Sequence, residues 1–353
     1  MVAGEYAVLE PNQSLVVTAV NRFIFVNIKS SKSNKLSLTD FQLNEINWTY
    51  DYGKMRLDLE DKRTSFVQEA MEVTFTYLEE QSVPITPVHM TIKSELDDES
   101  GNKYGLGSSA AVVTGVVTAL LTKYLHEEPS KDLIFKLSAI AHVKVQGSGS
   151  GADIAASTYG GMLEYKSFQA NWLLNEIKQT NKVTQIIKKS WKYLHIKKLN
   201  FPKDWHMLVG WTGSPASTAK LVPQVLAYKD KNEENFTNFL GKSAKAVIAI
   251  LSGIETKNID RFYLGIKQNR QALAEIGQLA DVPIETPLLY ELQKIAEEEG
   301  GAGKLSGAGG GDCGIAFTDQ QERIKKIKKK WEEYGIQNLE MTFYPDGVKK
   351  TLG

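Results

Sequence analysis

The sequence predicts an α+β protein made of two domains. Its 353 residues are more than one ordinary domain needs. Short β-branched and aromatic runs, typical of strands, occur among longer segments that carry the 3.6-residue period of helices. A polar, lysine-rich stretch from about residue 170 to residue 200 lies between the two halves. We therefore expect one domain over residues 1–200 and a second over residues 201–353.

The first half is expected to contain several strands, with a turn at Asn21–Arg22, and helices whose apolar side chains recur on one side. The predicted strands cover residues 14–30, parts of 36–60, 88–92 and 162–165, and the predicted helices cover 65–80, 112–125 and 130–144.

The second half shows the same mixture of patterns and completes an α+β domain. Strands are predicted over residues 205–211, 315–318 and 339–344, and helices over 215–229, 235–253, 257–281, 286–299 and 320–334.

Composition and charge exclude several classes of function. Basic and acidic residues both number 42, so no overall field favours nucleic acid or an acidic membrane. Ile324, Ile327 and Trp331 interleave the lysines of residues 325–330 at helical spacing, which predicts a solvated helix face. The single cysteine excludes a disulfide framework, and neither a signal peptide nor a membrane-spanning run is present. We expect a soluble cytoplasmic protein that binds neither nucleic acid nor membranes.

The glycine-rich segment Gly105–Ala111 runs directly into the predicted helix over 112–125. Such a turn leaves unpaired backbone N–H groups and the positive end of the helix dipole facing the loop. It is therefore a candidate site for an anion, and phosphate is the usual one.

Three known interpretations of a glycine-rich turn before a helix can be compared with this segment. The dinucleotide fingerprint needs a strand that enters the turn directly, but a polar stretch, residues 94–104, intervenes. The phosphate-loop motif of nucleoside triphosphatases fails at Gly303–Lys304, where the first glycine and the following Ser or Thr are missing. A helix cap at Ser108 or Ser109 without any ligand stays open.

Two further glycine-rich segments lie far away in the sequence. Residues 147–151 end the helix predicted over 130–144 and are followed by Asp153, and residues 306–314 precede the strand predicted over 315–318. Glycine weakens helices and strands, so such clusters mark sharp turns or close approach to a ligand. Together the three segments predict a site that handles phosphate.

The segments 3–8, 105–111 and 306–314 resemble the three signature motifs of the GHMP kinases in order and spacing. This resemblance implies an N-terminal α/β domain, a C-terminal ferredoxin-like domain and an active site in the cleft between them. Within the family, Tyr6 and the segments 103–105 and 210–212 are similar to the bacterial phosphomevalonate kinases. The implied reaction transfers the γ-phosphate of ATP to 5-phosphomevalonate with Mg²⁺, in a monomer or homodimer. A kinase for mevalonate or another small molecule, or a homologue that binds without turnover, is the alternative.

The resemblance also implies roles for individual residues. Asp153 matches the catalytic aspartate, Lys103 is a candidate for neutralising phosphate charge, and Ser109 matches a hydroxyl that contacts Mg²⁺. The loop that would wrap the ATP phosphates comprises Gly105, Leu106, Gly107, Ser108, Ser109 and Ala110. The residues that would contact the substrate are Ser150, Ser217, Thr218, Gly307, Ala308, Gly309 and Gly310.

Two departures from the family pattern accompany these matches. The family's main catalytic lysine precedes the position of Met1, so we expect either a start site assigned too late or a chain that has lost this cation. Some mevalonate kinases carry a glutamate where this chain has His142, so no carboxylate ligand for Mg²⁺ is identified. We expect all five histidines to be structural or on the surface. Cys313 is expected to be a small buried residue at the start of a strand.

Overall fold

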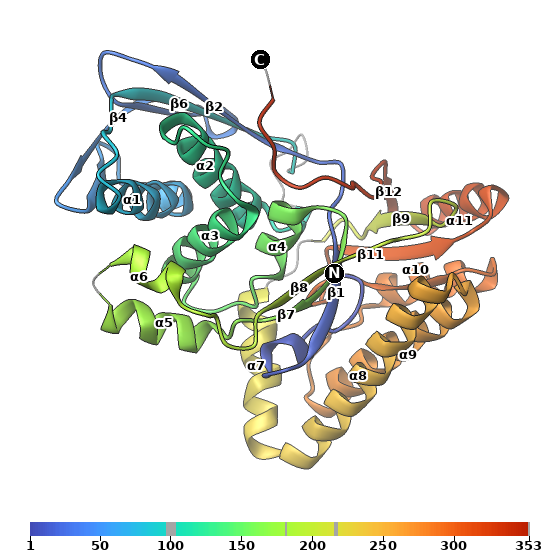
Figure 1. Ribbon diagram of the computed structural model, residues 1–353. Coiled ribbons are helices and arrows are strands. Elements are labelled where there is room, and N and C mark those ends of the chain that lie inside the picture. Colours follow the sequence, from blue (N-terminus) through green and yellow to red (C-terminus); the bar gives the residue numbers. More distant parts are fainter. Residues whose placement is uncertain (97–103, 181, 215–217, 352–353) are drawn as a thin grey trace.

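The computed structural model describes residues 1–96, 104–180, 182–214 and 218–351. They form two mixed α/β parts that lie side by side (Figure 1). The N-terminal part contains a five-stranded sheet in the order β2-β6-β3-β4-β5, in which only the β3–β6 pair is parallel. Its strands are β2 (Ile24–Ser30), β6 (Val88–Ser94), β3 (Lys35–Leu38), β4 (Leu43–Asp51) and β5 (Lys54–Leu57).

Helices cover one face of this sheet, and a smaller sheet follows towards the second part of the molecule (Figure 1). The helices are α1 (Ser65–Glu80), α2 (Ser108–Tyr124), α3 (Lys131–Gln146), α4 (Ala152–Tyr159), α5 (Ala170–Gln179) and α6 (Val183–Lys188). The smaller sheet is antiparallel and has the order β1-β7-β8, with β1 (Ser14–Thr18), β7 (Met162–Lys166) and β8 (His195–Leu199).

The C-terminal part contains an antiparallel sheet in the order β10-β11-β9-β12. Numbered along the chain, this is the order 2-3-1-4 of a ferredoxin-like domain, which the family resemblance predicted. The strands are β9 (His206–Trp211), β10 (Ala302–Leu305), β11 (Cys313–Thr318) and β12 (Gln337–Leu339). The helices are α7 (Thr218–Lys231), α8 (Glu233–Thr256), α9 (Ile259–Leu279), α10 (Pro287–Glu298) and α11 (Gln321–Glu333), with α7 to α10 placed between β9 and β10.

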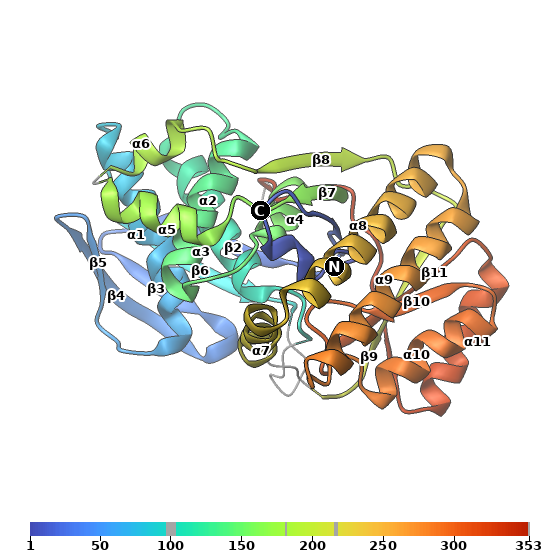
Figure 2. The same cartoon turned by 90° about the horizontal axis from the view of Figure 1, so that it is seen from below.

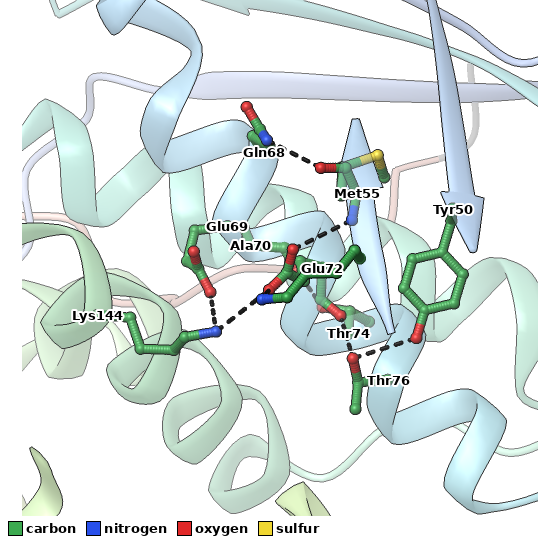
Figure 3. A network of polar contacts seen from close by, with 10 residues as sticks. Tyr50, Met55, Gln68, Glu69, Ala70, Glu72, Thr74, Thr76 and Lys144 are labelled. Atoms are coloured by element: carbon green, nitrogen blue, oxygen red, sulfur yellow. Dashed lines mark hydrogen bonds and ion pairs between the residues drawn. The ribbon is translucent and has the colours of Figure 1, made fainter. Parts of the chain in front are cut away.

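Helix α1 shows how polar groups help to fix the layers. Glu72 is buried on the side of α1 that faces β5, and its carboxylate accepts from the Met55 N–H at 3.1 Å. The ammonium groups of Lys54 and Lys144 lie 3.1 and 3.4 Å from it, so α1 is tied to both β5 and α3 (Figure 3). Burial alone would raise the pKa of Glu72, but these partners hold the pKa below its ordinary value.

Strand β1 belongs to the cores of both parts. Its alternating side chains point to opposite faces, as the two-residue period of a strand requires. Leu15 and Val17 pack in the core of the N-terminal part. Val16 packs instead with Val209 and Ile315 of the C-terminal sheet. The two parts therefore share a continuous apolar contact through one strand.

Several elements differ from the sequence-based expectations. The stretch 170–200 contains α5, α6 and β8, because its apolar residues, such as Leu173 and Ile186, are buried between lysines. The last strand covers 337–339 instead of 339–344, and among the described residues beyond it Phe343 forms an isolated bridge with Val20. Helix α4 and strand β10 were not predicted because their glycine-rich surroundings obscure any period. The domain boundary near residue 200, between β8 and β9, stays a prediction.

The expectation for the basic run is confirmed. Ile327 and Trp331 are buried, while the lysines of α11 remain at least partly exposed, so the basic run is a solvated helix face. Within the residues described here, no helix is both long and apolar enough to cross a membrane.

A buried ion pair joins the N-terminal segment to the C-terminal sheet. The carboxylate of Glu5 lies 2.5 Å from the ammonium of Lys304 in β10, and both side chains are at most 1% exposed. Asn269 of α9 donates to Glu5 at 2.9 Å and accepts from the Gly4 N–H at 3.0 Å. Although burial alone would raise the pKa of Glu5, the nearby positive charges hold that pKa below its ordinary value.

We expect Lys304→Met to lower the free energy of unfolding by about 3–5 kcal/mol, because Glu5 would be left as a buried charge without its cation. Urea unfolding measures this loss. The double variant Glu5→Gln with Lys304→Met should recover a large part of it. The matched control is Lys242→Met, which breaks an exposed pair with Glu275 and should cost at most about 1 kcal/mol. Equal losses in Lys304→Met and in the control would contradict the assignment.

Candidate active site

The loop before α2 is positioned by the C-terminal sheet. The Tyr104 ring packs edge-on against Trp211 of β9, with ring centroids 5.5 Å apart, and the Tyr104 carbonyl accepts from Cys313 Sγ at 3.2 Å. Gly107 is the N-cap of α2, and Ser108 and Ser109 are its first helical residues. The alternative of a simple serine cap is therefore wrong. A glycine cap has no side chain to accept from the first N–H groups of the helix, which keeps this end suitable for an anion.

The short helix α4 carries Asp153 in its first turn. Its carboxylate is exposed, while the neighbouring residues Ala152 and Ile154 are buried. Ser150 fixes the start of α4, because its hydroxyl accepts from the Ala152 N–H at 3.3 Å and its carbonyl accepts from the Tyr165 hydroxyl at 2.5 Å. Ser150 is 8% exposed, and its hydrogen bonds stabilise the turn before Asp153.

Two carboxylates approach the loop before α2. A Cβ atom at Gly107 would lie 3.1 Å from Asp153 Cβ, and a Cβ atom at Gly105 would collide with the carboxylate of Asp312. Both glycines have positive φ angles, 74° at Gly105 and 78° at Gly107, which also disfavour a side chain. Three segments that are far apart in the sequence therefore meet at this loop, where glycine alone leaves enough room.

Asp312 comes from the third glycine-rich segment, 306–314, between β10 and β11. Its backbone is fixed to the end of β9, because its carbonyl accepts from the N–H and the hydroxyl of Thr212 at 3.0 Å and its N–H donates to Ser214 at 2.8 Å. The N–H of Gly310 donates to Ile284 at 2.8 Å. The loop is thus held by the C-terminal part while its carboxylate reaches the N-terminal loop.

The N-terminal segment 1–8 lies against this same loop. The Tyr6 hydroxyl donates to the Ala308 carbonyl at 2.6 Å, and Ser306 Oγ exchanges hydrogen bonds of 2.9 Å with the backbone nitrogen and carbonyl of Met1. Burial raises the pKa of Tyr6, so the phenol remains a donor at neutral pH. The first and third signature segments are therefore in direct contact, as a shared site requires.

Ser109 has a partner that the sequence did not indicate. His142 Nε2 of α3 lies 3.1 Å from Ser109 Oγ, and the His142 ring packs against Phe66 with centroids 5.0 Å apart. Burial lowers the pKa of His142, although the charge of Asp153 acts in the opposite direction. We therefore expect a neutral imidazole at pH 7. Of the five histidines, this one is buried beside the site.

A pocket adjoins Ser108 and Ser109 between α2, α1 and the five-stranded sheet. Its lining contains both apolar or aromatic side chains and polar ones. The lining residues are Leu38, Phe41, Phe66, Val67, Ile92 and Val112, with Asp40, Arg63, Ser94, Ser108 and Ser109. Such a pocket is suited to a flat, mostly apolar group that enters next to the phosphate-binding end of α2.

The remaining predicted residues fall into three groups. Lys103 and Ser217 lie outside the described residues, and Thr218 is described only as the first residue of α7. Cys313 is the buried first residue of β11, as expected, and burial raises the pKa of its thiol to about 12. Lys304 belongs to the segment that failed the phosphate-loop motif, and its ammonium forms a buried ion pair with Glu5. No group of three or more His, Cys, Asp or Glu suited to a metal ion occurs in the described part of the chain.

Two family models match this chain, one in each part of the fold. The model of the GHMP kinases N-terminal domain matches residues 65–161, and that of the GHMP kinases C-terminal domain matches residues 250–337. The chain is 31% identical to a phosphomevalonate kinase of Streptomyces sp. (strain CL190), over 98% of this chain and 96% of the relative.

Solved structures give the same result. A Lin0012 protein from Listeria innocua matches with a TM-score of 0.93 and 40% identity, covering 100% of this chain and 97% of the other. Phosphomevalonate kinase of Streptococcus pneumoniae, in complex with phosphomevalonate and AMPPNP, matches with a TM-score of 0.83 and 26% identity over 96% and 95% of the two chains. Both the family models and the whole-length similarity show that this chain belongs to the GHMP kinases.

Proposed function

We propose that this protein transfers the γ-phosphate of ATP to 5-phosphomevalonate and releases 5-diphosphomevalonate. One observation carries the proposal: the glycine loop before α2, Asp153 and Asp312 meet at one place, although they come from three distant segments. The whole-length similarity to a phosphomevalonate kinase supports the choice of substrate within the family.

ATP is assigned to the N-terminal side of the site. Its phosphates would bind the N–H groups at the start of α2, from Gly105 to Ala110, where several donors and the helix dipole converge. Its base would enter the pocket lined by Phe41 and Phe66, next to Ser108. Lys103, just before the loop in sequence, is proposed to add positive charge to the phosphates.

The donor atoms of the site fit a magnesium ion. A carboxylate such as that of Asp153, beside a phosphate loop, would repel the phosphates unless a divalent cation lay between them. Ser109, Asp153 and Asp312 offer oxygen atoms, which Mg²⁺ prefers, and Mg²⁺ needs only one or two protein ligands when phosphates complete its shell. A bound ion there would neutralise charge on the β- and γ-phosphates.

The acceptor is assigned to the opposite side, between α4 and the loop 306–314. Gly307, Ala308, Gly309 and Gly310, with Ser150, Ser217 and Thr218, are proposed to contact it. Its nucleophile is a phosphate oxygen that is already mostly ionised at neutral pH, because the second pKa of a phosphate monoester is about 6. The main barrier is therefore repulsion between two anions, and aimed N–H groups and cations oppose that repulsion.

We expect purified protein with ATP and Mg²⁺ to release ADP when 5-phosphomevalonate is added, and far more slowly with mevalonate. Mevalonate is the matched control because it lacks only the phosphate. A coupled assay for ADP measures both rates. Turnover of mevalonate alone would identify a different kinase, and no turnover with either substrate would contradict the proposed function.

The acceptor chemistry also predicts a modest role for Asp153 as a base. We expect Asp153→Asn to lower kcat by less than about 10²-fold, whereas losing a general base commonly costs about 10²–10⁴-fold. Steady-state kinetics with 5-phosphomevalonate measures the change, and Glu255→Gln, on the exposed face of α8, is the control. A loss above about 10³-fold, with the binding of ADP and Mg²⁺ intact, would contradict this modest role for Asp153.

A further inference from the structure

The last part of the chain returns from the C-terminal part to the N-terminal part. Leu339, the last residue of β12, and Met341 are buried in the core that includes β9 and β11. The chain then runs past the connection between β1 and β2 and back towards the N-terminal part, as the two views in Figure 1 and Figure 2 show. We call residues 342–348 the C-terminal strap.

The strap is attached first to the connection between β1 and β2. Thr342 and Asn21 exchange two hydrogen bonds, from the Asn21 N–H to the Thr342 carbonyl at 3.1 Å and from the Thr342 N–H to Asn21 Oδ1 at 2.7 Å. The Tyr344 N–H donates to Ala19 at 3.0 Å, and the Tyr344 ring packs edge-on against Phe23.

The second attachment is to the C-terminal end of α4. The N–H of Val348 donates to the carbonyl of Ser157 at 2.8 Å, and the N–H of Gly161 donates to the carbonyl of Tyr344 at 2.8 Å. The backbones are so close that a Cβ atom at Gly160 would collide with the backbone of Asp346, and a Cβ atom at Gly347 would collide with the Thr158 carbonyl.

Two lysines hold the strap from its sides. The ammonium of Lys198 in β8 donates to the Pro345 carbonyl at 2.6 Å, and the ammonium of Lys131, the first residue of α3, donates to the Val348 carbonyl. Val348 itself packs against the core of the N-terminal part. The strap is therefore bound along its whole length by backbone and side-chain groups.

These contacts connect the strap to elements that carry both halves of the candidate active site. Ser157 lies one helical turn after Asp153 in the eight-residue helix α4. The other end of the strap continues from β12, which pairs with β9, and β9 holds Asp312 through Thr212. A short helix is not stable on its own, so its position depends on what binds its ends.

We propose that the C-terminal strap positions α4, and through it Asp153, relative to the loop 306–314. The inference rests on the proposed function, because it assigns the strap a role in phosphoryl transfer. The strap acts through α4 and touches no reacting group. Displacing α4 by about 1 Å is enough to lower a rate by about 10²-fold. ATP is assigned to α2, so its binding should be nearly independent of the strap.

Gly347→Ala tests the proposal without a change in backbone preference, because Gly347 does not have a positive φ angle and the added methyl group collides with the backbone of Thr158 and Tyr159 at the end of α4. The matched control is Gly241→Ala in α8, where the φ angle is also not positive and no atom lies within 4 Å of the new methyl group. We expect Gly347→Ala to lower kcat by about 10–100-fold and to change the KM for ATP by less than about twofold. Hydrogen exchange of residues 152–160 should become faster in this variant and stay unchanged in Gly241→Ala.

A chain that lacks residues 345–353 provides a second variant should Gly347→Ala fold poorly, and it should give the same kinetic pattern. Unchanged kcat in both variants, or unchanged hydrogen exchange of α4, would overturn the role of the strap. An equal loss of kcat and of ADP affinity would overturn it as well, because it would indicate general unfolding. Absence of turnover in the unmodified protein is a different result, since it contradicts the proposed function and not the strap, whose effect on α4 is still measured by hydrogen exchange.

Discussion

The loop before α2 leaves almost no room for a side chain at Gly105 and Gly107. The carboxylates of Asp312 and Asp153 come so close to Gly105 and Gly107 that no Cβ atom fits at the first and little room remains at the second. The rest of the molecule can be understood from this constraint. The two carboxylates come from different parts of the fold, so the two parts must keep a fixed relation to each other.

Several connections maintain that relation. Strand β1 packs into both apolar cores, and Glu5 forms a buried ion pair with Lys304 immediately before the loop 306–314. Buried ion pairs contribute little net stability compared with apolar replacements, but they strongly disfavour arrangements in which the charges are separated. The pair therefore specifies where the N-terminal segment lies. The C-terminal strap connects the two parts in the other direction, because it leads from β12 in the C-terminal sheet to α4 in the N-terminal part.

The sequence predicted those features that depend on local pattern. The bounds of α1 were correct, because its apolar period is long and regular, and the three glycine-rich segments were identified by their composition. The family resemblance then led to the ferredoxin-like sheet, which composition and periodicity could not have identified. Elements next to glycine-rich turns, such as α4 and β10, were missed, because their short patterns are hidden by neighbouring glycines.

The contacts that make the site were mostly beyond local inference. His142 lies 33 positions from Ser109 in the sequence, and Lys304 lies 299 positions from Glu5. The residues around each of them therefore give no indication of these contacts. Asp312 lay inside a recognised motif, and its place directly after three consecutive glycines was the one signal that could have indicated it. Charged residues inside the fold, such as Glu72, have partners that only the tertiary structure brings together.

A crystal structure of the protein with a non-hydrolysable ATP analogue and 5-phosphomevalonate tests the central claim most directly. The account predicts the β- and γ-phosphates on the N–H groups at the start of α2 and the base in the pocket beside Phe66. It also predicts the acceptor phosphate between Asp153 and the loop 306–314. A triphosphate bound away from α2, or an acceptor phosphate remote from both carboxylates, would contradict it.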